Sequence, residues 1–154
     1  MAAQMNYGYS TAKGIAGGIY DMYHYKVDSR INEEENGRLR LGVGVVKGTI
    51  PGSGVKLPAK ESTAVEFEGV IVNGFTDMQD MDGNVYVMKG HNVGAMREGR
   101  IWAIVTEGVT PAYGDSLYMD ESGCFNTSSG VKISGRFIGT VNNGVAPIEL
   151  YGVD

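Results

Sequence analysis

Hydrophobic and polar positions alternate with a period of two over most of the chain after residue 37. The clearest run is RLRLGVGV, residues 38–45, in which leucine and valine alternate with arginine and glycine. This alternation places the apolar side chains on one face of an extended strand. It predicts a half-buried strand that has small residues on its outer face.

The same pattern predicts further short strands separated by glycine-containing turns. They cover residues 67–73, 84–88, 93–96, 100–106, 117–119, 124–126, 131–133, 136–141 and 146–151. Turns are predicted at Asp82-Gly83 and Glu98-Gly99, and the strongest hairpin signal is Asn142-Asn143-Gly144. About ten short strands at close spacing are typical of a β-sandwich or a β-barrel.

Glycine supports this interpretation, because 24 of the 154 residues are glycine. Each interior glycine costs a helix roughly 1 kcal/mol, whereas hairpin turns repeatedly need its positive φ. We therefore predict an all-β fold, a glycine-rich barrel or sandwich with at most one helical turn at residues 62–66. Residues 38–154 form a single β domain in this prediction, and residues 1–37 form an extended N-terminal arm.

The predicted arm differs from the rest of the chain in composition. It holds five of the nine tyrosines and ends in the polar run NEEENG, with one short strand predicted around residues 19–27. Tyrosine is enriched at protein interfaces, so we expect the arm to carry contacts to a partner. The candidate contact residues are Tyr7, Tyr9, Lys13, Tyr20, Tyr23, Tyr25, Lys26 and Arg30. The alternative is that these tyrosines pack on the chain's own sheet.

Charge is distributed unevenly along the chain. Residues 1–60 carry a formal charge of +3 and residues 61–154 carry −8, for a net charge of −5. A negative net charge argues against a nucleic-acid partner, because such binding depends on neutralising phosphates. A mildly basic leading segment on an acidic body also predicts that Lys13, Lys26 and Arg30 make attachment sensitive to salt.

No combination of residues in the sequence indicates catalysis, a metal or a cofactor. Asp80 and Asp82 fit two positions of a calcium loop, but Met78 and Lys89 stand where further ligands are required. The two histidines, His24 and His91, belong to no zinc-binding spacing, and the chain has no complete Gly-x-Ser-x-Gly or Walker motif. We expect a protein that is not an enzyme and needs neither cofactor nor metal.

Two single residues have structural interpretations. Cys124, the only cysteine, excludes an internal disulfide and is expected to be a small buried side chain beside Phe125. Trp102 lies in an alternating run at residues 101–105 that predicts a strand buried on both faces, so we expect its indole to be buried.

Four stretches resemble the structural cement proteins, or capsid decoration proteins, of tailed bacteriophages. They are residues 6–46, FEGVIVNGF, GRIWAIVTEGVTPAYGDSLYMDESGCF and GRFIGTVNNGVAPIEL, and together they extend over nearly the whole chain. The resemblance rests on the overall pattern, and it transfers no individual functional residue.

This resemblance implies a non-enzymatic protein on the outer surface of the mature capsid lattice. Such proteins commonly act as trimers at local three-fold sites and clamp neighbouring major capsid subunits. The implied partners are the major capsid protein and further copies of the chain, as a homotrimer or alternatively a dimer. The sequence shows no apolar signal region and no run of about 18 apolar residues. We therefore expect no membrane partner, and synthesis in the host cytoplasm.

Two other classes stay open at this point. A carbohydrate-binding or host-adhesion module of a virion would also be all-β and glycine-rich, with Trp102 in an exposed aromatic platform. An esterase-like enzyme would need a serine or a carboxylate pair that converges with a base in a pocket.

Overall fold

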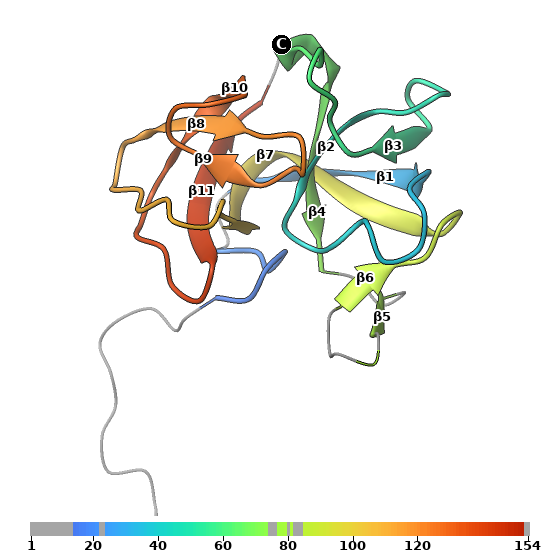
Figure 1. Cartoon of the computed structure of the whole chain (residues 1–154), viewed down its shortest axis with the longest axis horizontal. Coiled ribbons are helices and arrows are strands. Elements are labelled where there is room, and N and C mark those ends of the chain that lie inside the picture. Colours follow the sequence, from blue (N-terminus) through green and yellow to red (C-terminus); the bar gives the residue numbers. More distant parts are fainter. Residues whose placement is uncertain (1–13, 22–23, 74–76, 80, 82–84, 153–154) are drawn as a thin grey trace, which may run out of the picture.

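A computed structural model describes residues 14–21, 24–73, 77–79, 81 and 85–152. The described chain is all-β apart from one 3-10 turn, as predicted, and Figure 1 shows its two strand groups side by side. The elements in chain order are β1 (Lys26–Asn32), β2 (Gly44–Lys47), β3 (Gly54–Lys56), η1 (Ala64–Glu66), β4 (Phe67–Val72), β5 (Asp77–Gln79), β6 (Val85–Val87), β7 (Asn92–Ile104), β8 (Ser116–Met119), β9 (Phe125–Asn126), β10 (Val131–Phe137) and β11 (Val145–Tyr151).

Nine of these strands form one sheet in the order β1-β3-β2-β4-β7-β11-β10-β8-β9. An additional antiparallel pairing of β1 with β7 closes the first five into a barrel, here called the first barrel. The barrel is mixed, because β1 and β3 run parallel. Strands β5 and β6 make a separate two-stranded sheet.

The strands β7, β11, β10, β8 and β9 form the second group, here called the C-terminal sheet. A parallel bridge between Val105 and Phe125 brings its last strand back to the end of β7, where Thr106 N–H donates to Phe125 O at 2.9 Å. β7 therefore belongs to both strand groups and joins them.

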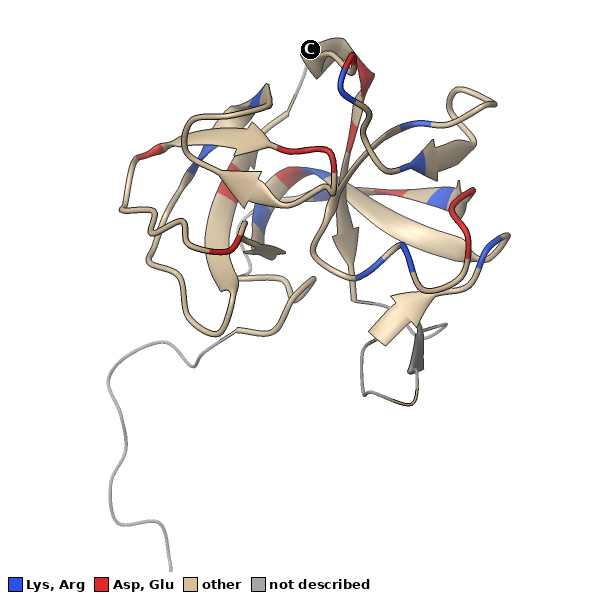
Figure 2. Cartoon of the chain, in the orientation of Figure 1, with Lys and Arg blue, Asp and Glu red and all other residues tan. Residues whose placement is uncertain are grey.

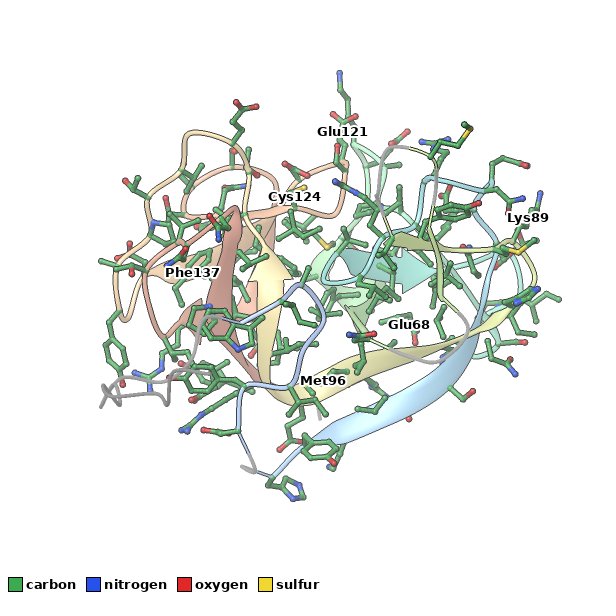
Figure 3. All side chains as sticks on the ribbon, turned by 90° about the horizontal axis from the view of Figure 1, so that it is seen from below. Glu68, Lys89, Met96, Glu121, Cys124 and Phe137 are labelled. Atoms are coloured by element: carbon green, nitrogen blue, oxygen red, sulfur yellow. The ribbon has the colours of Figure 1, made fainter. Side chains whose placement is uncertain are left out.

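The described residues form two hydrophobic cores. The first barrel encloses Leu39, Leu41, Val43, Val45, Val55, Ile71, Val87, Val93 and Ala95. The larger core lies between the C-terminal sheet and the first barrel, and its members include Val70, Met96, Ile101, Leu117, Met119, Phe125, Phe137 and Ile148. Ala95 and Met96 are successive residues of β7 that point into different cores. Figure 3 marks Met96 and Phe137, both 0% exposed.

The turn predicted at Glu98-Gly99 is wrong, because β7 runs through it as one strand of 13 residues. At this place β1 pairs with Met96 and then with Glu98, so Arg97 is an extra residue in β7. Gly99 takes a φ of +129°, a backbone conformation that L side chains rarely adopt. Glu98-Gly99 thus marks a bulge within a strand, and glycine suits a bulge as well as it suits a turn.

The run at residues 38–45 is also buried more completely than its alternation predicts. Every residue from 41 to 46 is buried, including Gly42 and Gly44. A Cβ on Gly42 would lie 2.9 Å from Gly17 N, and a Cβ on Gly44 would meet the Met119 sulfur. The predicted half-buried strand is therefore wrong in two respects. Only Gly44 and Val45 of this run belong to a strand, β2, while residues 41–42 form a turn. The second face is also buried, because glycine lets other parts of the chain approach closely.

Other predicted elements are confirmed. β4 matches residues 67–73, the 3-10 turn lies within residues 62–66, and Asn143 and Gly144 adopt φ values of 52° and 79° in the hairpin before β11. The two strands predicted at residues 131–133 and 136–141 are instead one strand, β10, with a register shift between Ile133 and Arg136. No helix in the described parts of the chain is long and apolar enough to cross a membrane.

Candidate functional site

The first described residues are hydrogen-bonded to the β strands. Residues 14–21, here called the anchor segment, follow the edge of β7 that lies beyond β1. Gly17 N–H donates to Trp102 O at 2.8 Å, Trp102 N–H donates to Gly18 O at 2.9 Å, and Tyr20 N–H donates to Arg100 O at 3.0 Å. A further bond from Asn73 N–H to Gly17 O, 2.9 Å long, ties the same segment to the end of β4.

Glycine makes this close approach feasible. Gly17 and Gly42 both have a φ of +79°. A Cβ on Gly17 would lie 2.9 Å from Asn73 N, and a Cβ on Gly42 would lie 2.9 Å from Gly17 N. Gly14 lies flat against the Trp102 indole, and a Cβ there would overlap the ring atoms. The glycines of the sequence GIAGG thus act as a packing surface for the anchor segment.

An ion-pair network fixes the far end of the anchor segment. Arg100 on β7 binds Asp21 and Glu149 of β11, each at 2.9 Å. The hydrogen bond to Asp21, followed by that to Glu149, raises the pKa of Arg100 above its usual range. Glu149 also lies 3.8 Å from Arg136, whose guanidinium stacks 4.9 Å above the Tyr113 ring. Residues far apart in sequence therefore hold the anchor segment to two strands of the C-terminal sheet.

Of the candidate contact residues, the structure describes Tyr20, Tyr25, Lys26 and Arg30; Tyr7, Tyr9, Lys13 and Tyr23 lie outside the described residues. Tyr20 is half-buried and packs on Trp102 with ring centroids 5.5 Å apart. Tyr25 keeps 42% of its surface exposed. These two tyrosines therefore divide, one packing on the chain's own sheet and one facing outward.

Lys26 and Arg30 lie on β1 and pair with acids of the same chain. Lys26 binds Glu98 at 3.2 Å, and Arg30 binds Glu68 at 3.3 Å with only 15% of its side chain exposed. Basic and acidic residues are intermingled along this part of the sheet (Figure 2). Since their charges are already balanced, these two residues contribute little net attraction to an acidic partner.

The polar run after β1, which was assigned to the arm, is bound to the body through backbone hydrogen bonds. The Glu33 carboxylate accepts from Thr49 N–H at 2.9 Å, and Glu34 accepts from Leu57 N–H at 2.9 Å. Asn36 accepts from Lys89 N–H at 2.8 Å. The Lys89 ammonium binds Glu35 at 2.7 Å, which lowers the pKa of Glu35 (Figure 3 labels Lys89). Sequence reasoning missed this role, because a charged run looks the same whether it is solvated or bonded.

Metal-ligating side chains do not cluster among the described residues. No three of their His, Cys, Asp and Glu side chains are placed to hold a metal ion. Asp80 and Asp82 lie outside those residues. Cys124 is buried, as expected, and burial raises the pKa of its thiol, which keeps it protonated and unreactive.

Comparison with known families identifies the architecture. The model of the family "Structural cement protein (E217 gp24/Pam3 gp6)" matches residues 3–151. The chain belongs to this family. It is therefore a structural, non-enzymatic component of a phage capsid.

A solved phage capsid contains a chain with a similar fold. A chain in the solved capsid of Myoviridae phage XM1 superposes with a TM-score of 0.71 over 98% of both chains, at 14% sequence identity. At that identity the likeness establishes the fold. No curated protein matches the cement protein.

The expectation that Trp102 is fully buried is wrong, since the residue is of intermediate exposure. It lies on the outer face of β7, and Gly14 and Tyr20 of the anchor segment cover its ring. The anchor segment thus packs on the Trp102 ring, which does not form an open aromatic platform.

Replacing this residue, Trp102→Ala, is expected to cost about 2 kcal/mol of unfolding free energy, below the 3–5 kcal/mol typical of fully buried aromatics. The variant should also be cut faster by protease within residues 14–21, because their packing surface is lost. Chemical denaturation and limited proteolysis measure the two effects, with Tyr151→Ala as control, because Tyr151 is an aromatic residue that is 52% exposed. Unchanged proteolysis of the anchor segment would show that its backbone hydrogen bonds hold it without the indole.

Proposed function

We propose that this cement protein sits on the outer surface of the mature capsid lattice and clamps neighbouring major capsid subunits, acting as a homotrimer. The observation that carries the proposal is that the family match begins at residue 3 and so includes the N-terminal part together with the β body. Of the candidate contact residues, Tyr7, Tyr9 and Lys13 are proposed to meet the capsid or another copy, since Tyr20, Lys26 and Arg30 already have partners within the chain.

The attachment of the anchor segment supports a clamp. A clamp has to transmit force from its contact residues to a rigid body. Residues 1–13, here called the N-terminal tip, enter the body at Gly14, directly before the hydrogen bonds to β7 and β4. Those bonds and the Arg100 ion pairs would share a load applied through the tip. The division into arm and body is also a proposal, and these contacts favour a boundary near residue 14 over one near residue 38.

Multivalency would supply the strength of attachment. One tip carries two tyrosines and one lysine, which is a small contact by itself. Three tips on one trimer would raise the overall affinity by orders of magnitude through effective concentration. This accounts for a lasting attachment through small individual contacts.

The test is co-sedimentation of a chain lacking residues 1–13 with expanded and unexpanded capsid shells. We expect the truncated chain to keep the melting temperature of the full chain, because every described contact remains. It should lose most of its binding to expanded shells. The control is Ile50→Ser, which removes another exposed apolar side chain, 66% exposed, from the loop before β3.

Repeating the co-sedimentation at low and high salt distinguishes a tyrosine contact from a charged one. Because Lys26 and Arg30 are paired within the body, we expect the binding of the full chain to survive high salt, as a tyrosine contact would. Strong salt sensitivity would instead implicate Lys13. Full binding by the truncated chain would contradict a role for the tip and move the contact to the body.

A further inference from the structure

Strand β1 has one edge paired with β7 and another edge that is largely open. Asn32 N–H donates toward β7, to His91 O at 3.0 Å, whereas Ile31 N–H donates the opposite way, to Ser53 O at 2.9 Å. Backbone groups of successive strand residues point to alternate edges. The N–H and C=O groups of Val27 and Ser29 therefore point away from β7, on the same side as those of Ile31.

No described strand covers that part of the edge. β3 pairs with β1 only at Ile31 and Asn32, and the remaining pairs of β1 are all with β7. Arg30 Nη1 donates to Ser29 O at 2.9 Å, so the open groups are the N–H of Ser29 and both groups of Val27. β1 runs along the border of the molecule in Figure 3, with β7 on its inner side. An open edge of this kind can pair with an added strand.

The same stretch presents an apolar outer face. Tyr25, Val27 and Ile31 alternate along the chain and are 42%, 39% and 40% exposed. Across from Ser29 the neighbouring strand has Gly94, which adds no side chain. An added strand would therefore find aromatic and β-branched side chains on this face to pack against.

The charged side chains around β1 are balanced by one another. Lys26 pairs with Glu98 at 3.2 Å, Arg97 with Asp28 at 3.3 Å, and Arg30 with Glu68 at 3.3 Å. A charged segment would find no unpaired opposite charge in this set. The segment that fits the edge is extended, uncharged and alternates large with small side chains.

The N-terminal tip contains such a segment. Residues 6–12, NYGYSTA, are uncharged and alternate Tyr7, Tyr9 and Thr11 with small or amide residues. Tyrosine and threonine both favour strands. The chain from Gly14 back to Asn6 spans about 28 Å when extended, so the segment can lie along a second molecule that packs beside Gly14.

We propose that residues 6–12 of one copy add as a strand to the open edge of β1 in a second copy. Each copy then gives one strand and receives one, a heterologous contact that closes into a ring when the rotation between copies allows it. This rests on the proposed function only for the presence of neighbouring copies on the capsid. It narrows the partner of the tip, proposed above as the capsid or another copy, to another copy.

The test compares the self-association of full-length variants in solution by light scattering. Ser29→Pro removes the outward N–H without touching the bonds to β7, and proline is tolerated at such edge positions. We expect it to weaken self-association about tenfold or more, because one backbone hydrogen bond is lost and the proline ring occupies the space that the added strand would take. The matched control Ser29→Ala keeps the N–H and should behave as the unmodified chain. The double variant Tyr7→Ser/Tyr9→Ser should also be monomeric, and its substitutions lie outside the β body.

Mixing separates exchange between copies from folding back within one copy. Ser29→Pro keeps an intact tip and Tyr7→Ser/Tyr9→Ser keeps an intact edge, so the two monomeric variants should form a one-to-one complex when combined. A full chain that is monomeric, an unaffected Ser29→Pro assembly, or no complex on mixing would each overturn the proposal. Capsid co-sedimentation by a chain that is monomeric in solution would leave the proposed capsid attachment standing while overturning this exchange.

Discussion

Deleting residues 1–36 is expected to abolish cooperative folding of the protein, whereas deleting residues 1–13 is expected to leave folding intact. The longer deletion removes all of β1, and with it the strand that closes the first barrel against β7 and β3. It also removes Asn32, 1% exposed, whose side chain donates to Val87 O at 2.9 Å and accepts from Glu34 N–H at 2.8 Å.

The loss should be large because several interactions disappear together. The backbone N–H groups of Thr49, Leu57 and Lys89 would lose their side-chain acceptors, and the first barrel would gain an open side. A buried group left unsatisfied, such as Val87 O after the loss of Asn32, costs about 1–3 kcal/mol, and total stabilities are only about 5–15 kcal/mol. Circular dichroism melting of both truncated chains measures the difference. A cooperative transition in the longer deletion would show that the barrel folds without β1.

Replacing Phe137 with alanine is expected to reduce the unfolding free energy by about 3–5 kcal/mol. Phe137 is 0% exposed and ends β10 in the larger core, among side chains of β7, β8 and β11. Its backbone also joins β10 to the loop before β8, since Phe137 N–H donates to Asp115 O at 3.0 Å and Gly114 N–H donates to Phe137 O at 2.8 Å. Because these backbone bonds should persist in the variant, the loss of unfolding free energy measures the cost of the cavity left by the side chain.

Urea denaturation measures this loss, with Tyr151→Ala as the matched control. Tyr151 is also an aromatic residue on the C-terminal sheet, but it is 52% exposed, so its replacement should cost about 1 kcal/mol or less. Equal losses at the two positions would mean that the larger core collapses around the cavity or contributes little to stability.

The sequence predicted the kinds of element well because their signals are local. Alternation identified β4 and β11, and the Asn142-Asn143-Gly144 turn needed no distant contact to be recognised. The same local signals failed at Gly99 and at Gly42. Glycine serves a turn, a bulge or a close packing contact equally well, and only the neighbouring chain shows which of these applies.

The contact surface stays a prediction, because residue type alone does not show which side chains face a partner. The tyrosines and basic residues before residue 38 were all assigned to one arm. The structure places Tyr20 against Trp102, and Lys26 and Arg30 in ion pairs on β1. A tyrosine that packs internally and one that faces a partner have the same composition, so their spatial neighbours have to be known.

By itself, then, the sequence determined an all-β, glycine-rich chain with its strand segments, its final hairpin and its resemblance to phage cement proteins, because residue type and spacing encode these locally. Only the tertiary structure decided that β7 is one bulged strand shared by two cores, that residues 14–21 and 26–36 bond to other strands and loops, and that no described strand covers the outer edge of β1 from Val27 to Ser29. These features depend on pairing between residues far apart in the chain, such as Gly17 with Trp102 and Arg100 with Glu149, which no local pattern specifies.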